Sequence, residues 1–399
     1  MAFLTAQEAA VRLGVSRKTL YAYVSRGLLK AYVAENPRER QYAEAAVDRL
    51  AAERHRGRRP QEVAKATLDW GLPVLESGIT LIRDGRIWYR GVDVIDLART
   101  ADLEDAAAIL WPARRATAFG PEAPRTSMQA DSAASAPATG LSRETLMARF
   151  ASLTGEEDTA AWISDPALLA AGCGQLVRCL ASCVTAVAPT VEPVHQQCAR
   201  NWDLDASGAD LVRAVLVLCA DHELNTSGFA VRCTASTGAS LRACVIGGLA
   251  ALSGPLHGGT ASRVEALWDM VETDGPDIAV RRRLMAGETL PGFGQLLYPN
   301  GDPRAAALLS RLPPAASPAA SLVETVARST GEKPTIHFAL VAVCRFLGLP
   351  RGSAFGLFAL GRSVGWIAHA LEQRANGSPI RPRAVYVGPL PDTSTPHKK

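Results

Sequence analysis

Apolar residues recur at the spacing of α-helical turns through most of the chain beyond residue 168, and this pattern restricts the fold more than any other feature. Ala and Leu are abundant, whereas aromatic residues make up only 6% of the chain. This composition favours packed helices over a β-sandwich, which is typically richer in Val, Tyr and Thr. The segments with helical periodicity are 169–187, 209–222, 240–252, 262–272, 322–329, 336–347 and 354–373.

Residues 78–91 follow a different pattern, in which apolar and polar residues alternate. Asp84 and Gly85 lie at its centre, and this pair favours a tight turn in which both residues adopt a positive φ. We therefore expect a β-hairpin ahead of the helical region.

Turn and capping signals divide the N-terminal part of the chain into short elements. Residues 5–8 read Thr-Ala-Gln-Glu, a capping box that starts a helix ending near Leu13. A second helix is expected over 17–26, two short strands over 28–42, and a third helix over 43–54. This order resembles the small winged helix-turn-helix domains of the MerR and excisionase type. The resemblance implies a DNA-binding domain.

The charge of this region supports a polyanionic partner. Residues 1–70 carry 13 Lys and Arg against 8 Asp and Glu, so the positive excess of the chain lies here. The side chains expected to face DNA are Arg17, Lys18, Thr19, Tyr21 and Tyr23 on the second helix and Arg38 and Arg40 on the hairpin. The alternative is that these side chains only solvate a small helical appendage.

A glycine-rich segment, 254–259, reads Gly-Pro-Leu-His-Gly-Gly and places His257 where the backbone can pass close to a ligand. Five further motifs accompany it: Asp-His-Glu-Leu-Asn-Thr-Ser at 221–227, Leu-Pro-Gly-Phe-Gly-Gln at 290–295, Gly-Asp-Pro-Arg at 301–304, Gly-Arg at 361–362 and Ile-Arg-Pro-Arg at 380–383. In this order the six motifs resemble the citrate synthase family, whose members join an acyl-CoA to a 2-oxo acid. The resemblance extends from about Leu68 to Leu390.

The resemblance implies three catalytic positions, of which two differ from the family. His257 matches the histidine that donates a hydrogen bond to the enol of the thioester. Gln295 stands where the family has the histidine that serves as acid toward the ketone, and an amide cannot give up a proton near neutral pH. His337 stands where the family has an aspartate base. We therefore expect weak or altered condensation.

The binding residues that the resemblance implies match the family more closely than the catalytic residues do. His222, Arg304, Arg362 and Arg381 match the family residues that hold the oxaloacetate carboxylates, since guanidinium groups fit carboxylate geometry. In the family the last arginine comes from the partner subunit, which implies a homodimer. Pro291, Gly292, Phe293 and Gly294 match the turn that meets the CoA adenine. Taken singly, each arginine is more often a surface cation and His222 a helix-terminal residue, but the four residues in register with the family motifs favour a dicarboxylate pocket.

The resulting expectation is a mainly α fold with a citrate synthase-like large helical domain, an inserted small helical domain and a preceding winged helix-turn-helix domain. The expected bounds are 1–56 for the DNA-binding domain, 57–70 for a linker, 71–259 with 351–399 for the large domain, and 260–350 for the small domain. Two functions fit: a citrate or methylcitrate synthase-like acyltransferase, or a non-catalytic regulator that senses a metabolite and binds DNA. Neither needs a permanently bound cofactor, because the acyl-CoA is a substrate or ligand.

The eight cysteines include no Cys-x-x-Cys pair, which favours buried thiols in a reducing compartment. A metal site built on Cys179 and Cys183 lacks a clustered histidine or carboxylate, so no metal is expected. No apolar run of membrane-spanning length and no signal peptide is recognised. We therefore expect a cytoplasmic protein without a membrane partner.

Overall fold

A computed structural model describes residues 3–13, 15–25, 29–33, 40–48, 50, 75–123, 140–153, 159–313 and 318–389. The chain divides into two compact units, Met1–Glu76 and Ser77–Lys399. The predicted linker at 57–70 lies outside the described residues.

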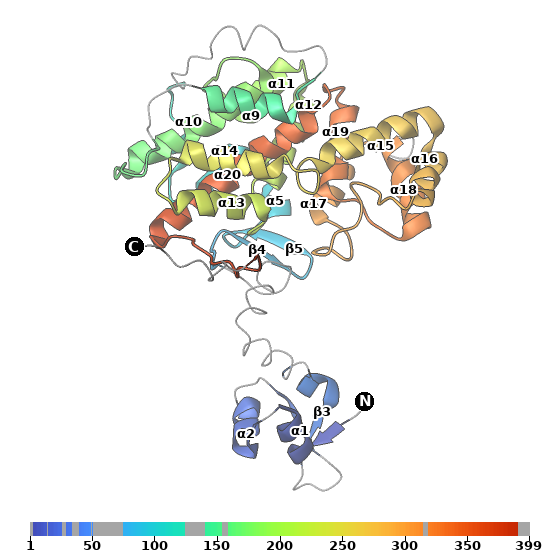
Figure 1. The fold of residues 1–399 in the computed structure, drawn as a ribbon. Coiled ribbons are helices and arrows are strands. Elements are labelled where there is room, and N and C mark those ends of the chain that lie inside the picture. The colour runs from blue at the N-terminus through green and yellow to red at the C-terminus, as the bar shows by residue number, and fades with distance from the viewer. Residues whose placement is uncertain are drawn as a thin grey trace, which may run out of the picture. The chain divides into compact units, whose positions relative to one another are not determined.

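The first unit combines short helices with a three-stranded antiparallel sheet. Its helices are α1 (Ala6–Leu13) and α2 (Arg17–Ser25), and its strands are β1 (Phe3–Thr5), β2 (Ala31–Val33) and β3 (Arg40–Ala43), in the sheet order β1-β3-β2 (Figure 1). The predicted capping box is confirmed, since Glu8 N donates to Thr5 Oγ1 and Thr5 N donates to Glu8 Oε2. Strand β1 was not predicted, because three residues are too few for a periodic signal.

A small apolar core holds this unit together. Its members are Ala9, Ala10, Leu13, Leu20, Leu29, Tyr42 and Val47, all buried. Tyr23 packs against this core and is only partly exposed, and its expected contact with DNA stays a prediction. Tyr23 lies three residues after Leu20 and therefore shares its face of α2.

The second unit is mainly helical, which confirms the predicted fold class (Figure 1). Its helices are α5 (Val94–Leu97), α6 (Leu103–Leu110), α7 (Arg115–Ala118), α9 (Arg143–Ser152), α10 (Pro166–Thr185), α11 (Val194–Asn201), α12 (Ala206–Cys219), α13 (Thr226–Ala235), α14 (Leu241–Leu252), α15 (Thr260–Asp274), α16 (Pro276–Met285), α17 (Pro303–Leu309), α18 (Pro318–Thr330), α19 (Ile336–Phe346) and α20 (Ser353–Asn376).

The predicted hairpin is present. Strands β4 (Thr80–Arg83) and β5 (Arg86–Tyr89) pair in antiparallel register, and β6 (Val92–Asp93) adds a short third strand. Asp84 and Gly85 form the turn with φ values of 50° and 73°, the left-handed conformation that the sequence required.

Helix α20 runs through the middle of the helical core and contacts α12, α13, α14 and α10. Helices α10 and α20 are long and apolar enough to cross a membrane, which corrects the expectation that no run reaches this length. However, 72% and 94% of their most apolar windows are buried inside the protein. Both therefore have the environment of core helices.

Helices α15, α16 and α18 lie together on one side of this unit (Figure 1). Helix α15 begins directly after the His257 turn, and the chain returns to the core through α19. Loops of the helical core around α20 therefore lie next to loops of the group formed by α15, α16 and α18. Most of the predicted site residues lie on these loops or on the helix turns beside them. The predicted bounds of the large and small domains stay a prediction.

Candidate functional site

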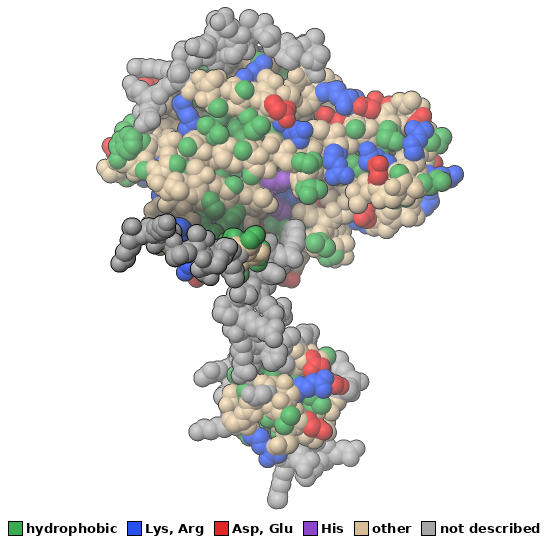
Figure 2. All heavy atoms as spheres, viewed as in Figure 1, with side chains coloured by type: hydrophobic (Ala, Val, Ile, Leu, Met, Phe, Trp, Pro, Cys, Tyr) green, Lys and Arg blue, Asp and Glu red, His purple; other side chains and the backbone are tan. Residues whose placement is uncertain are grey.

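Five predicted site residues reach one region of the second unit from separate elements. His222 follows α12, His257 precedes α15, Arg304 lies in the first turn of α17, His337 in the first turn of α19, and Arg362 in the middle of α20. In this unit, histidine side chains line a hollow between the α13–α14 side and the α15–α16 side (Figure 2).

Two glycines explain the shape of the His257 turn. A Cβ atom on Gly258 would lie 2.5 Å from Leu252 Cγ, and one on Gly259 would lie 2.6 Å from Ser253 O. Only glycine permits the backbone to fold back this closely against the end of α14. His257 is thereby held beside α13, where its Nε2 lies 2.9 Å from Ser227 Oγ.

Phe358 is the common neighbour of three predicted residues. Its ring centroid lies 4.9 Å from that of His337 and 6.4 Å from that of His257, and both imidazoles meet it edge to face. The guanidinium carbon of Arg362 lies 4.8 Å from the same centroid. Phe358 was not predicted, although it lies one helical turn before Arg362 on α20 and that spacing is a usable signal.

Tyr298 connects two of the predicted binding residues. Its hydroxyl oxygen lies 2.9 Å from His222 Nε2, and the guanidinium carbon of Arg304 lies 5.7 Å from the centre of its ring. Burial raises the pKa of Tyr298 to about 12, so the hydroxyl remains protonated at neutral pH. Sequence reasoning missed this residue, because nothing in its local pattern indicates the contact.

Asp302 holds Arg304 in place and joins α17 to α19. Arg304 donates from Nε to Oδ1 at 3.0 Å and from Nη2 to Oδ2 at 2.8 Å. Ile336 N, at the start of α19, donates to the same Oδ2 at 3.1 Å. Both members of the pair are at most 3% exposed. Burial alone would raise the pKa of Asp302, but the Arg304 charge and these bonds hold it below its ordinary value.

The three imidazoles favour their neutral form. Burial, followed by the Arg362 charge, lowers the pKa of His257 to about 4. Burial, followed by His257 and the two arginines, lowers the pKa of His337 to about 3. The same causes take the pKa of His222 well below its ordinary value. His337 Nδ1 is buried without a hydrogen-bond partner among the described residues.

Arg362 is the second buried guanidinium of the site. It is 1% exposed, and its Nε donates to Cys219 O at 2.9 Å. In the part of the chain that the structure describes, no carboxylate oxygen lies within 4.0 Å of its nitrogens. The buried Asp221 carboxylate offsets part of the Arg362 charge, because each group shifts the pKa of the other. Since no carboxylate pairs directly with the Arg362 nitrogens among the described residues, the guanidinium suits an anionic ligand.

Gln295 lies in an adjoining cavity of about 240 Å³. Gly294, Tyr298, Lys333 and Thr335 also line it, so the cavity borders the His222 and Arg304 side of the site. Pro291, Gly292 and Phe293 are buried and do not line this cavity. Gly294 N donates to Lys333 O at 2.9 Å, so this amide is engaged within the protein.

Arg381 does not join this cluster within one chain. It lies in an exposed, extended segment that follows α20, and the structure shows no contact between it and the other predicted site residues among those described.

The predicted DNA-facing residues of the first unit are partly described. Arg17 and Tyr21 are exposed on α2, and Arg40 is exposed on β3. Thr19 is engaged in capping α2, since its amide donates to Ser16 Oγ at 3.2 Å. The Lys18 side chain and Arg38 lie outside the described residues.

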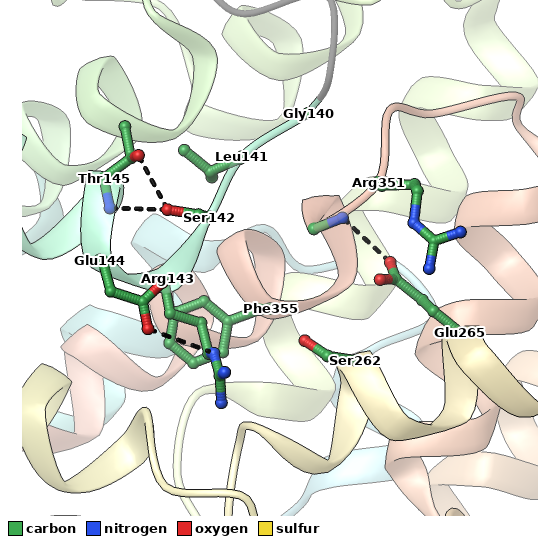
Figure 3. Close-up of a pocket in the computed structure, with 11 residues that line it drawn as sticks. Gly140, Leu141, Ser142, Arg143, Glu144, Thr145, Ser262, Glu265, Arg351 and Phe355 are labelled. Atoms are coloured by element: carbon green, nitrogen blue, oxygen red, sulfur yellow. Dashed lines mark hydrogen bonds and ion pairs between the residues drawn. The ribbon is translucent and has the colours of Figure 1, made fainter.

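A second cavity, of about 380 Å³, contains none of the predicted residues. It lies between the start of α9, α15 and the segment before α20 (Figure 3). Its charged side chains are engaged: Arg143 donates to Ser253 O, Glu265 accepts from Gly352 N, and Arg351 pairs with Asp269. No unpaired group there indicates a ligand in the described part of the chain.

The citrate synthase C-terminal domain family matches residues 67–383, and a helix-turn-helix domain family matches residues 3–55. Citrate synthase 2 of Bacillus subtilis is 35% identical over 184 residues, covering 44% of this chain and 50% of the relative. The 2-methylcitrate synthase of Shewanella oneidensis is 33% identical over 190 residues, covering 44% and 50%. The chain therefore spans about half the length of the curated relatives it matches.

Among solved structures, the citrate synthase of Thermoplasma acidophilum in a ternary complex with carboxymethyl coenzyme A and oxaloacetate matches with a TM-score of 0.64. The match covers 82% of this chain and 97% of that one at 24% sequence identity. At this identity the likeness establishes the fold.

Proposed function

This chain belongs to the citrate synthase family. From that premise we propose that a 2-oxo dicarboxylate such as oxaloacetate binds beside an acyl-CoA in the cleft formed by His222, His257, Arg304, His337 and Arg362. We further propose that the condensation of the two is slow. One observation carries the proposal: two buried arginines and three neutral imidazoles converge, while the carboxylate of Asp302 is already bound to Arg304.

The arginines support dicarboxylate binding. The bonds to Asp302 use Nε and Nη2 of Arg304, and the bond to Cys219 O uses Nε of Arg362. The remaining Nη groups make no hydrogen bond with the described part of the chain, so they are free to donate to a ligand. Two carboxylates of one small molecule would satisfy both arginines. His222 and the Tyr298 hydroxyl would supply further polar contacts beside Arg304.

The proton-transfer groups support slow turnover. Condensation needs a base to remove a proton from the thioester methyl, and His337 is the group on the α19 side of the cleft. Its pKa of about 3 makes it a weak base. Gln295 can polarise a ketone oxygen but cannot protonate it. The loss of a placed proton donor costs about 10²–10⁴-fold in rate.

The cavity beside Gln295 supports acyl-CoA binding. It opens along Gly294 and Lys333, and the Lys333 ammonium could pair with a phosphate of the nucleotide. Gly294 has a φ of 73°, and a Cβ there would lie 2.8 Å from Glu332 Oε1, so a larger residue would disturb this wall.

A homodimer is part of the proposal. The segment after α20 is exposed and includes Val385, Tyr386 and Val387, which are 63%, 70% and 92% exposed. Apolar side chains in this number favour packing against a second copy. Arg381 in the same segment would then reach the partner's cleft.

A metabolite-sensing DNA-binding regulator is the second candidate. The helix-turn-helix match and the exposed Arg17 and Arg40 favour it. In this function the cleft would bind its ligands without turnover and alter the DNA affinity of the first unit.

The test combines ligand binding with turnover on the full-length protein. Thermal unfolding is followed with oxaloacetate, citrate, CoA and acetyl-CoA, because a ligand that binds only the folded state stabilises it whether or not it reacts. Free thiol release from acetyl-CoA with oxaloacetate is measured in parallel. We expect stabilisation by the dicarboxylates and by CoA, with turnover far below about 10 per second.

Arg362→Lys is the matched variant, since it keeps the charge but loses the fork-shaped donor. We expect it to reduce stabilisation by oxaloacetate and to leave stabilisation by CoA unchanged. Stabilisation by neither class of ligand would overturn the binding proposal, and turnover at ordinary enzyme rates would overturn slow condensation.

A further inference from the structure

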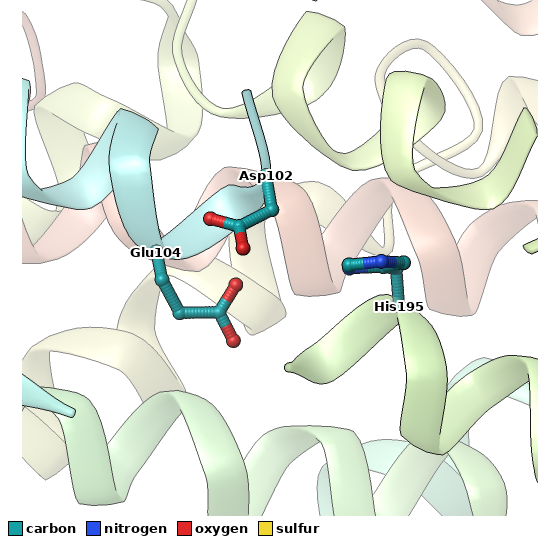
Figure 4. Close-up of side chains that lie close together, drawn as sticks. All are labelled: Asp102, Glu104 and His195. Carbon is teal, nitrogen blue, oxygen red and sulfur yellow. The ribbon is translucent and has the colours of Figure 1, made fainter. Parts of the chain in front are cut away.

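A cluster of three buried side chains lies at the start of α6 and α11. Asp102 precedes α6, Glu104 lies in its first turn, and His195 lies in the first turn of α11. One ligand atom from each lies within 4.8 Å of the other two. The two carboxyl groups face each other, and an edge of the imidazole faces the same gap (Figure 4). The three side chains are 8%, 3% and 8% exposed.

Two atoms of this cluster lack a partner. Glu104 Oε1 accepts a bond from Val194 N at 2.8 Å, but Glu104 Oε2 is buried with no hydrogen-bond partner among the described residues. His195 Nδ1 is likewise buried with no partner there. Because a buried carboxylate oxygen without a donor is costly, the arrangement requires a further group in the gap.

The neighbouring cations do not fill this need. Arg115 is shared between Asp102 and Asp105, with bonds of 2.7 and 2.6 Å to the two oxygens of Asp102. It therefore balances only one of the three carboxylates. Arg178 directs its hydrogen bonds to backbone carbonyl oxygens, among them Gly120 O and Val191 O. No Lys or Arg nitrogen among the described residues lies within 4.0 Å of a Glu104 oxygen.

We propose that Asp102, Glu104 and His195 bind a divalent transition-metal ion of the Zn²⁺ type. One imidazole nitrogen and two carboxylate oxygens are ligands that Zn²⁺ accepts, and a water molecule completes four-coordination. Ligand atoms about 2.1 Å from a tetrahedral metal lie roughly 3.4 Å apart, so small side-chain rotations close the present spacing.

Gln196 can orient the imidazole for this role. Its amide nitrogen lies 3.1 Å from His195 Nε2, and the side chain is exposed. When the amide turns, its oxygen accepts a bond from Nε2–H and leaves the Nδ1 lone pair for the metal. Such hydrogen bonds to the second ring nitrogen commonly orient metal-binding histidines. The metal would tie the start of α6 to the start of α11.

The experiment uses the full-length protein without an affinity tag. The protein is stripped with a chelator, dialysed against Zn²⁺, and its metal content is measured by mass spectrometry. We expect one Zn²⁺ per chain. Glu104→Gln and His195→Asn should each weaken Zn²⁺ binding by at least about 100-fold, since even the loss of an orienting neighbour costs about 10- to 100-fold. Glu192→Gln, three residues before His195 and paired with Arg200, is the matched control and should bind Zn²⁺ normally.

Two further measurements keep the proposal testable. Co²⁺ loaded in place of Zn²⁺ should give visible absorption bands of a low-coordinate site in the wild type and none in His195→Asn. Zn²⁺ should raise the unfolding temperature of the wild type, and Mg²⁺ should not. No zinc retained by the wild type, or equal zinc in both ligand variants and the control, would overturn the proposal. Either result is independent of condensation activity.

Discussion

The imidazole of His337 meets the ring of Phe358 edge to face, with the ring centroids 4.9 Å apart. This contact fixes the direction of the imidazole and leaves its buried Nδ1 without a partner among the described residues. Phe358 lies one turn before Arg362 on α20, so the Arg362 guanidinium packs over the same ring. The position proposed for the base and the proposed anion site therefore share one wall.

Restoring carboxylate and histidine groups to the cleft should raise the condensation rate. The double variant Gln295→His with His337→Asp regains an acid on the ketone side and a stronger base, each worth about 10²–10⁴-fold when well placed. Thiol release from acetyl-CoA with oxaloacetate measures the effect, with the two single variants as controls. An unchanged rate in the double variant would mean that the cleft is suited to another reaction.

Breaking the Asp302–Arg304 pair should destabilise the protein strongly. Arg304→Met leaves a buried carboxylate without its cation, which costs about 3–5 kcal/mol. Adding Asp302→Asn to that variant should recover part of the loss, because the orphaned charge is removed. Urea unfolding monitors both. Arg328→Met is the control, since its pair with Asp277 is exposed and such pairs contribute about 0–1 kcal/mol; an equal loss in the control would contradict the prediction.

Stability should fall as the pH drops from about 6.5 toward about 4. The unfolded chain binds a proton at each histidine near pH 6.5, whereas the folded protein lowers the pKa of His257 to about 4 and that of His337 to about 3. The unfolded state therefore takes up more protons in this window, at up to about 1.4 kcal/mol per pH unit for each group. His337→Asn should flatten the urea-unfolding profile there. An identical slope in the variant and the wild type would refute the assignment.

Dicarboxylate binding should take up protons. An anion beside His257 and His337 opposes the effect of Arg362 and raises both pKa values from about 4 and about 3. The affinity should therefore increase as the pH falls below neutrality. Calorimetry in two buffers with different ionisation enthalpies counts the protons. Proton release, or an affinity that weakens on mild acidification, would contradict the proposed site.

DNA binding by the first unit should depend on salt and on Arg17. Phosphate contacts release counterions, so the affinity should fall linearly on logarithmic axes as salt rises. Arg17→Ala should lower the affinity for genomic fragments and make the salt dependence shallower by about one contact. Arg12→Ala is the control, because Arg12 pairs with Glu44 and Asp48 within the domain. Binding that ignores salt, or equal losses in both variants, would remove the DNA proposal.

Local signals predicted the local structure. The Asp84-Gly85 pair gave the hairpin turn, the Thr5 and Glu8 spacing gave the capping box, and periodicity located α20 to within a few residues. The prediction missed shorter helices of the second unit: α5, α6, α7, α9, α11, α13, α16 and α17. Short helices give few turns of periodic signal, and α11 and α13 pack against α12 and α14, which stabilises them in the fold.

Tertiary contacts could not be predicted in the same way. The pairing of Tyr298 with His222 joins residues 76 positions apart, and no pattern in either segment indicates it. The burial of Arg304 and Arg362 likewise depends on the packing of whole helices. The resemblance located these arginines because it carries information about three-dimensional neighbours that a single sequence lacks.

Asp302 Oδ2 accepts hydrogen bonds from Nη2 of Arg304 and from the amide of Ile336. Ile336 is the first residue of α19 and directly precedes His337. A displacement of that carboxylate would therefore shift the anchor for the dicarboxylate and the imidazole together. Binding of the proposed dicarboxylate at Arg304 would therefore be transmitted through Asp302 to the start of α19, where the proposed base lies.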